Sequence, residues 1–190
     1  MDARFTKTIF FTALSVIFAF TAITYVSCST DKCQATVCAY GGTCDNGTCK
    51  CLPGYTGANC QSIIAQKYFG TWTVSETGTI SNNANFTTAI DSSYTSLTQV
   101  LINNFYNRYP PTENVVADLQ GVDSLKIHPQ TMSNGDRVEG VAVYTPDASS
   151  GSQEQHGTLT IYFSVTNSSN QVDDFGYVVG LNGVPSIWSK

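Results

Sequence analysis

The chain has 190 residues, of which 42% are hydrophobic and only 12% are charged. It carries 9 basic and 14 acidic residues, for a formal net charge of −5 at pH 7. This balance argues against nucleic acid as a partner, because binding to phosphates requires a basic surface. This length allows one ordinary globular domain plus a smaller unit, and the charged fraction is about half the usual share.

Residues 1–27 have the pattern of an export signal. Arg4 and Lys7 supply a positive start, and the stretch from Ile9 to Val26 contains no charged residue. We therefore expect a signal peptide over 1–27. The alternative is a retained signal anchor, because an uncharged helix of this length spans roughly 27 Å, close to the thickness of a bilayer core. Both interpretations place the rest of the chain outside the cytoplasm.

The residues at the end of this segment indicate a lipid anchor. Ser27 is a small residue directly before Cys28, although Tyr25 stands where Leu is usual. This arrangement resembles the lipobox of bacterial lipoproteins, which implies that Cys28 is lipidated and becomes the N-terminus. Two or more acyl chains hold a protein stably on a membrane. By the same resemblance, Ser29 favours the outer membrane or cell surface; the alternatives are a signal-anchored or a secreted protein.

Seven cysteines, all between positions 28 and 60, indicate an oxidising compartment. With Cys28 set aside, six remain that can pair. Their spacing, the sequence Gly41–Cys44 and the sequence Cys49–Cys60 resemble an EGF-like module, and the resemblance covers residues 31–61. It implies the disulfides Cys33–Cys44, Cys38–Cys49 and Cys51–Cys60. Three such bridges replace the hydrophobic core that about thirty residues cannot form.

Calcium-binding members of that family carry oxygen ligands before the first cysteine and in a longer hairpin. Here Asp31 is followed by Lys32, and only Asp45-Asn46-Gly47-Thr48 lies between Cys44 and Cys49. A hard cation needs several converging oxygen atoms. We therefore expect no metal site in the module and no cofactor. The Asn-Gly pair instead predicts a type I′ hairpin turn.

The residues after Cys60 predict a mainly β chain. We expect a helical turn at Ile63–Phe69, followed by short strands in which apolar and polar residues alternate. Successive short strands with tight turns favour an antiparallel β-barrel or sandwich of about eight strands. The expected strands cover residues 71–75, 85–90, 97–103, 115–119, 125–128, 137–144, 158–165 and 175–181. The expected organisation is a signal peptide (1–27), a lipidated tether (28–32), an EGF-like module (33–60), a linker (61–68) and an antiparallel β-domain (69–190).

Two further resemblances concern this β-domain. Gly70-Thr71-Trp72 is similar to the Gly-x-Trp pattern in the first strand of lipocalin-like barrels; the alternative is a Trp that fills the core of any sandwich. The whole arrangement is also similar to bacterial surface lipoproteins with an EGF-like module before a small β-domain of undefined function. That similarity is carried by residues 69–76, 100–105 and 127–131.

No residue pattern of a catalytic site is present. His128 and His156 lack partners at metal-ligand spacing, and we expect them at solvated turns or strand ends. Asp173-Asp174 and Asp147 are compatible with a cation site or a carboxylate pair, but acids at turns are typical of solvated surface. We therefore expect that the protein is not an enzyme.

The most distinctive candidate for binding is the stretch from residue 105 to residue 111. Aromatic side chains beside Asn and Arg in a loop that ends in two prolines suit contact with a sugar or a peptide, and its candidate residues are Phe105, Tyr106, Arg108 and Tyr109. The alternative is a loop that packs its own aromatics over the end of the barrel.

These observations predict a membrane-anchored, surface-exposed lipoprotein with a structural or interaction role, with the EGF-like module as a spacer. Its partners would be the membrane, through Cys28, and a protein or glycan. The alternative is a lipocalin-like carrier of a small apolar ligand. A carrier needs an open interior of roughly 300 Å³ or more, whereas an interaction domain has a core filled by side chains.

Overall fold

The computed structural model describes residues 31–110, 112–147 and 156–190, so the leader and Cys28 lie outside the described residues. The described chain divides into two compact units. One is rich in disulfides and comprises the residues up to Cys51 together with Ala58–Cys60; the other comprises Leu52–Gly57 and Gln61–Lys190.

The disulfide-rich unit contains the bridges Cys33–Cys44, Cys38–Cys49 and Cys51–Cys60, which are the pairs that the EGF-like resemblance implies. Its hairpin joins β1 (Thr43–Asp45) to β2 (Thr48–Lys50). Asn46 and Gly47 in the turn have φ angles of 56° and 87°, as a type I′ turn requires. A side chain at Gly42 would lie 2.9 Å from Sγ of Cys60, so close packing beside the third bridge requires a glycine there.

The second unit begins with short elements. Strand β3 (Tyr55–Thr56) pairs with β4 (Ser62–Ile63), and the 3₁₀ helix η1 (Ile64–Tyr68) follows where a helical turn was expected. The segment expected as a linker, 61–68, therefore forms regular secondary structure over residues 62–68. In the described part of the chain, no helix is both long enough and apolar enough to cross a membrane.

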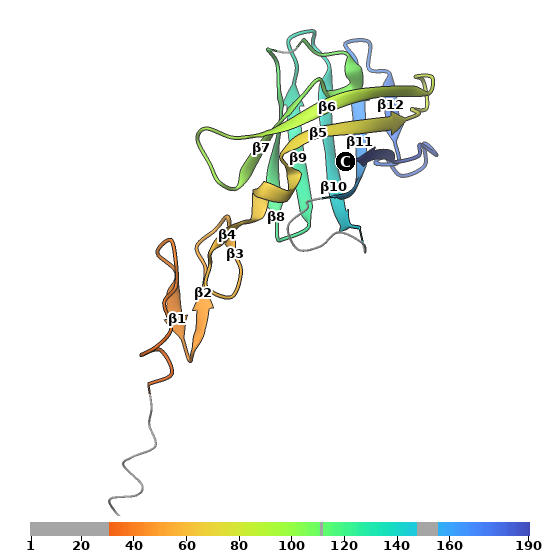
Figure 1. The fold of residues 1–190 in the computed structure, drawn as a ribbon. Coiled ribbons are helices and arrows are strands. Elements are labelled where there is room, and N and C mark those ends of the chain that lie inside the picture. Colours follow the sequence, from red (N-terminus) through yellow and green to blue (C-terminus); the bar gives the residue numbers. More distant parts are fainter. Residues whose placement is uncertain (1–30, 111, 148–155) are drawn as a thin grey trace, which may run out of the picture. The chain divides into compact units, whose positions relative to one another are not determined.

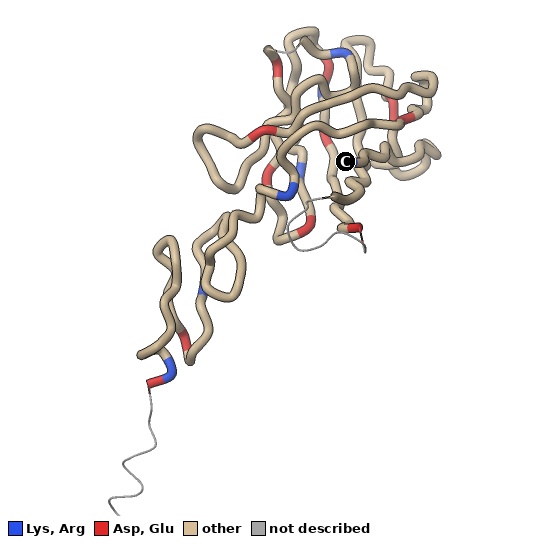
Figure 2. Tube along the Cα trace, in the orientation of Figure 1, with Lys and Arg blue, Asp and Glu red and all other residues tan. Residues whose placement is uncertain are grey.

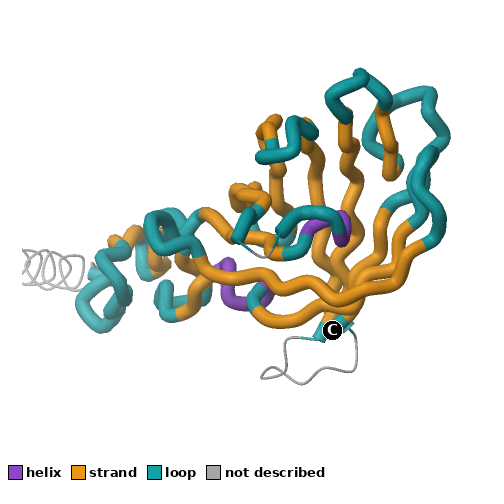
Figure 3. The backbone as a smooth tube through the Cα atoms, turned by 90° about the horizontal axis from the view of Figure 1, so that it is seen from above, coloured by secondary structure: helices purple, strands orange, loops and turns teal. Residues whose placement is uncertain are grey.

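Eight antiparallel strands then close into a barrel (Figure 1). Of the two expected architectures, the β-domain is therefore a barrel and not a sandwich. Its wall runs in the order β5-β6-β7-β8-β9-β10-β11-β13, and β13 pairs with β5. Figure 3 shows that strands account for most of this unit. The strands are β5 (Gly70–Glu76), β6 (Ala84–Ser92), β7 (Gln99–Asn103), β8 (Val115–Gln120), β9 (Ser124–Thr131), β10 (Arg137–Pro146), β11 (Gly157–Thr166) and β13 (Ser186–Ser189).

The alternating patterns define which side chains enter the barrel. On β11, Leu159, Ile161, Phe163 and Val165 are buried while the residues between them are more exposed, apart from Ser164. An eight-stranded barrel is just wide enough for side chains to fill. Phe163 stacks on Phe175 with ring centres 4.1 Å apart. The other large, fully buried side chains include Trp72, Trp188, Tyr68, Phe105, Ile90 and Leu125.

The prediction of a strand at 175–181 is wrong. Strand β12 (Val172–Phe175) ends where that strand was expected to begin, and it pairs with the C-terminal half of β11. Gly176 then has a φ of 74°, and the buried carboxylate of Asp174 accepts backbone N–H groups from residues 176–178. These bonds turn the chain into a loop in which Val179 is fully exposed, and β13 was not predicted.

Phe163 provides a test of the packed interior. Replacing it with Ala removes contacts with three neighbouring aromatic rings and leaves a cavity, so we expect the free energy of unfolding to fall by about 3–5 kcal/mol. Urea unfolding measures this change. Val143→Ala, on the exposed side of β10, is the control and should change stability by less than about 1 kcal/mol. Equal losses in the two variants would contradict a filled barrel.

Candidate functional site

The loop after β7 contains the candidate binding residues, and two of the four belong to the core. Phe105 and Tyr109 are only 1% and 3% exposed. The ring centre of Phe105 lies 4.7 Å from that of Phe163 and 6.0 Å from that of Trp188. For these two residues the alternative is correct: they pack over the barrel and are not available to a partner.

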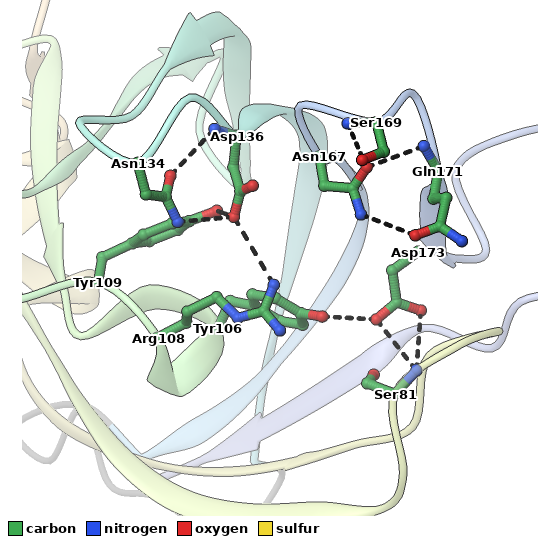
Figure 4. Close-up of polar contacts among 10 residues, drawn as sticks. All are labelled: Ser81, Tyr106, Arg108, Tyr109, Asn134, Asp136, Asn167, Ser169, Gln171 and Asp173. Carbon is green, nitrogen blue, oxygen red and sulfur yellow. Dashed lines mark hydrogen bonds and ion pairs between the residues drawn. The ribbon is translucent and has the colours of Figure 1, made fainter.

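Tyr106 and Arg108 are exposed to different degrees at the same end of the barrel (Figure 4). The hydroxyl of half-buried Tyr106 donates a hydrogen bond of 2.6 Å to Oδ2 of Asp173. The guanidinium carbon of Arg108 lies 5.1 Å from the centre of the Tyr106 ring, and the Arg108 side chain is 55% exposed. The loop therefore presents one cation supported by one aromatic ring.

The backbone of this loop adopts an unusual conformation. Asn104, Tyr106 and Asn107 have φ angles of 47°, 59° and 45°. Asn tolerates the left-handed region, but a bulky Tyr there is strained and persists only where surrounding contacts hold it. The Nδ2 atom of Asn104 donates to the carbonyl of Thr87 at 2.9 Å, and the Tyr106 hydroxyl is held by Asp173. Contacts on both sides thus hold the loop in this strained conformation.

Asp173 connects three segments at this end of the barrel. It lies on β12, is 5% exposed, and accepts hydrogen bonds from Tyr106 and from the backbone N–H groups of Ile80 and Ser81 in the β5–β6 loop. Burial raises the pKa of this carboxyl, but the hydrogen bonds from Tyr106, Ile80 and Ser81 outweigh burial, so its pKa lies below the ordinary value. Asp173 therefore stays charged as an internal anchor.

The prediction that Asp173 and Asp174 form solvated surface is wrong, because Asp174 is 0% exposed and Asp173 nearly so. Each carboxylate instead holds a loop through backbone N–H groups. Asp136 is also only 5% exposed, but its carboxylate accepts from a side chain, Nδ2 of Asn134 at 2.9 Å. A nitrogen of Arg108 approaches Oδ2 of Asp136 at 3.8 Å.

A pocket of about 290 Å³ opens between these segments. Most of the side chains around it are polar, and Asn167 donates from Nδ2 to Oε1 of Gln171 at 3.1 Å. A second hollow of about 200 Å³ shares Ser81, Tyr106 and Arg108 with it. We call the first of these hollows the mouth pocket. It is lined by Ile80, Ser81, Tyr106, Arg108, Val165, Asn167, Gln171 and Asp173.

Glu76 lines the second hollow and is a buried acid. Its Oε2 accepts a hydrogen bond of 2.9 Å from the hydroxyl of Ser186, which itself accepts from Nε1 of Trp188 at 2.8 Å. Burial raises the pKa of Glu76 to about 7, against the lowering effect of the Ser186 hydrogen bond and with a smaller increase from Asp173. The group therefore changes charge near neutral pH.

Sequence reasoning missed Ser81, Gln171 and Glu76 as parts of the site. Asn167 stands in an Asn-x-Ser/Thr sequence, as Asn46 and Asn85 also do, and this pattern does not indicate a pocket. These residues lie on separate loops and strands, and no local pattern marks them. Only the closure of the barrel brings β5, β11 and β12 to the same end.

The remaining candidates lie outside the mouth pocket. Nε2 of His128 lies 3.2 Å from Oδ2 of Asp118 on the barrel wall, with the His128 side chain 60% exposed. His156 and Asp147 are exposed. Among residues 31–110, 112–147 and 156–190, no group of three or more His, Cys, Asp or Glu side chains converges to hold a metal ion.

No model of a known protein family matches the chain. A solved structure of a Bacteroides ovatus protein, described as structural genomics with unknown function, aligns with 64% of this chain at 10% sequence identity and a TM-score of 0.37. The alignment spans 41% of that protein's chain. A similarity of this size establishes neither a family nor a function.

Tyr106→Phe tests the connection between the loop and Asp173. The change removes one hydrogen bond to a charged acceptor, so we expect the free energy of unfolding to fall by about 1.5–3 kcal/mol. Urea unfolding measures the loss, and Tyr94→Phe is the matched control because Tyr94 is 96% exposed. If the two variants were equally stable, the Tyr106 hydroxyl would not anchor the loop.

Glu76 predicts a pH dependence of stability. Its pKa is about 7 in the folded protein against an ordinary 4.5, so the stability that it contributes is complete below pH 4.5 and is lost as the pH rises to about 7. Between pH 5 and pH 8 we expect the wild type to lose on the order of 2 kcal/mol more of its free energy of unfolding than Glu76→Gln loses. Parallel pH profiles of the two proteins would contradict the assignment.

Proposed function

We propose that this chain is an exported lipoprotein, held to a membrane through Cys28, whose barrel binds a partner at the mouth pocket. The leader and Ser27-Cys28 support export and lipidation, and three disulfides between Cys33 and Cys60 support an oxidising compartment. In this proposal the disulfide-rich unit is an EGF-like spacer, and the role of the protein is interaction or adhesion at the cell surface.

The observation that carries the binding role is the contrast between the interior and the mouth of the barrel. The interior is occupied by large aromatic and aliphatic side chains with no exposure, including Trp72, Phe163 and Trp188. At the mouth, in contrast, polar side chains are held in place around an open hollow. Rigid elements that present ordered polar and aromatic groups on loops are typical of binding sites.

The lipocalin-like carrier remains the second candidate, on the strength of the closed eight-stranded barrel and of Gly70-Thr71-Trp72 in its first strand. Trp72, however, is fully buried and its indole N–H donates to the carbonyl of Tyr68 at 2.7 Å. The tryptophan thus occupies interior space that an apolar ligand would need. The filled interior favours binding at the mouth.

The charge distribution supports a partner other than nucleic acid. Lys and Arg positions are few and scattered over the described trace (Figure 2). Lys67 and Lys190 already have partners in this unit, Lys67 through Asp123 and Lys190 through the carbonyls of Lys67 and Phe69. A continuous basic surface, which would be needed to hold phosphates, is lacking in this part of the chain.

One experiment tests both parts of the proposal. Cells that express the full chain are fractionated, labelled with radioactive palmitate, and assayed for adhesion to plates coated with collagen, fibronectin or mucin. We expect the wild type to be labelled, to stay with the membrane and to adhere to at least one plate. Cys28→Ala should lose the label and the membrane association, because an acyl chain contributes about 0.8 kcal/mol per buried CH₂ group.

Arg108→Ala tests the mouth pocket in the same assay. It should keep the label and the membrane association but lose most of the adhesion. The matched control is Arg137→Ala, because the Arg137 side chain is also 55% exposed and also lies beside one carboxylate, that of Glu139. Unchanged labelling of Cys28→Ala would overturn the lipid anchor, and equal adhesion by Arg108→Ala and Arg137→Ala would overturn binding at the mouth.

A further inference from the structure

Building on the proposed function, we infer that the mouth pocket binds an uncharged sugar unit. The shape of the pocket, the hydrogen-bonding groups on its wall and the balance of its charges each point to this class of ligand.

The size and lining of the pocket suit one small, polar ligand. Its volume of about 290 Å³ is at the lower end of the range of small-ligand sites. Ile80 and Val165 provide an apolar strip, and hydroxyl, amide and guanidinium groups surround it. A sugar ring has the same mixture, with C–H groups on its faces and hydroxyl groups around its edge.

Donor groups remain at the open side of the pocket. Arg108 has five N–H donors, and the contact with Asp136 involves one nitrogen at 3.8 Å, beyond ordinary hydrogen-bond length. Oε1 of Gln171 accepts a hydrogen bond from Asn167. This bond orients the Gln171 amide and does not use its two N–H donors. Arg108 and Gln171 are both exposed, so a ligand can reach them.

The carboxylate of Asp173 has a different role from these donors. It already accepts hydrogen bonds from Tyr106, Ile80 and Ser81, so its function is to position the wall of the pocket. The Tyr106 ring lies beneath the guanidinium of Arg108 and limits where that group can point. Because the loop is already ordered, the binding of a ligand costs little further conformational entropy.

The balance of charge argues against an ionic ligand. The positive charge of Arg108 lies near the carboxylate of Asp136, and the carboxylate of Asp173 lines the same pocket (Figure 4). An anionic sugar would approach these two carboxylates, and a cationic one would approach Arg108. A neutral ligand with many hydroxyl groups meets neither penalty and can pair with the fixed donors.

The test uses the full chain in detergent micelles with defined probes. An array of immobilised neutral, acidic and basic oligosaccharides is screened first, and the sugars that bind are titrated by calorimetry. We expect binding to neutral oligosaccharides, with no gain from a uronic acid or an amino sugar. Arg108→Ala and Gln171→Ala should each weaken the binding by about tenfold or more. A change of this size corresponds to the loss of one hydrogen bond between the sugar and a charged or well-oriented donor. Arg137→Ala should leave it unchanged.

Three results would overturn the inference: no neutral oligosaccharide on the array binds, charged sugars bind more tightly than neutral ones, or Arg108→Ala binds a neutral sugar as tightly as Arg137→Ala does. These failures differ from failure of the proposed function. If adhesion depends on Arg108 but no neutral sugar binds, the protein has a binding site at the mouth for another class of ligand.

Discussion

The site at the end of the barrel depends on one buried carboxylate. Asp173 joins β12 to the β5–β6 loop through the N–H groups of Ile80 and Ser81, and to the loop after β7 through the hydroxyl of Tyr106. Its hydrogen bonds more than offset the cost of burying a charge, so it stays ionised, and they hold Tyr106 in a backbone conformation that a tyrosine rarely adopts. Arg108 follows Tyr106 by two residues in the chain, so its position over the Tyr106 ring depends on the same bonds.

The filled barrel gives this end its rigidity. Gly140 on β10 allows the wall to approach β11 closely, because a side chain there would lie 2.5 Å from the carbonyl of Tyr162 and 2.7 Å from Cβ of Phe163. Phe163 in turn supports Phe105, which directly precedes Tyr106 in the chain, and Phe175, which follows Asp173 by two residues. A core of this kind leaves the loops as the place for binding, and we propose that a partner is recognised at the polar lining of the mouth.

Alternation of apolar and polar residues was sufficient to predict most of the strands, because burial on one face is a local property of each strand. It failed at 175–181, where Phe175, Tyr177 and Val179 alternate, yet the buried carboxylate of Asp174 turns the chain. The composition of the loop pointed to Tyr106 and Arg108 but did not separate them from Phe105. The burial of Phe105 depends on Phe163, which lies 58 residues further along the chain (163 − 105). The other residues of the mouth pocket meet only after closure of the barrel, which no local pattern reveals.

The most direct test of binding at the mouth is a map of amide and indole N–H chemical shifts in the full chain during titration with neutral oligosaccharides. If a ligand binds at the mouth, we expect the changes to be concentrated at Ser81, Arg108 and Gln171, while the indole signals of Trp72 and Trp188, both fully buried in the interior, stay unchanged. Changes centred on the two indoles would contradict it, because they would place the ligand inside the barrel.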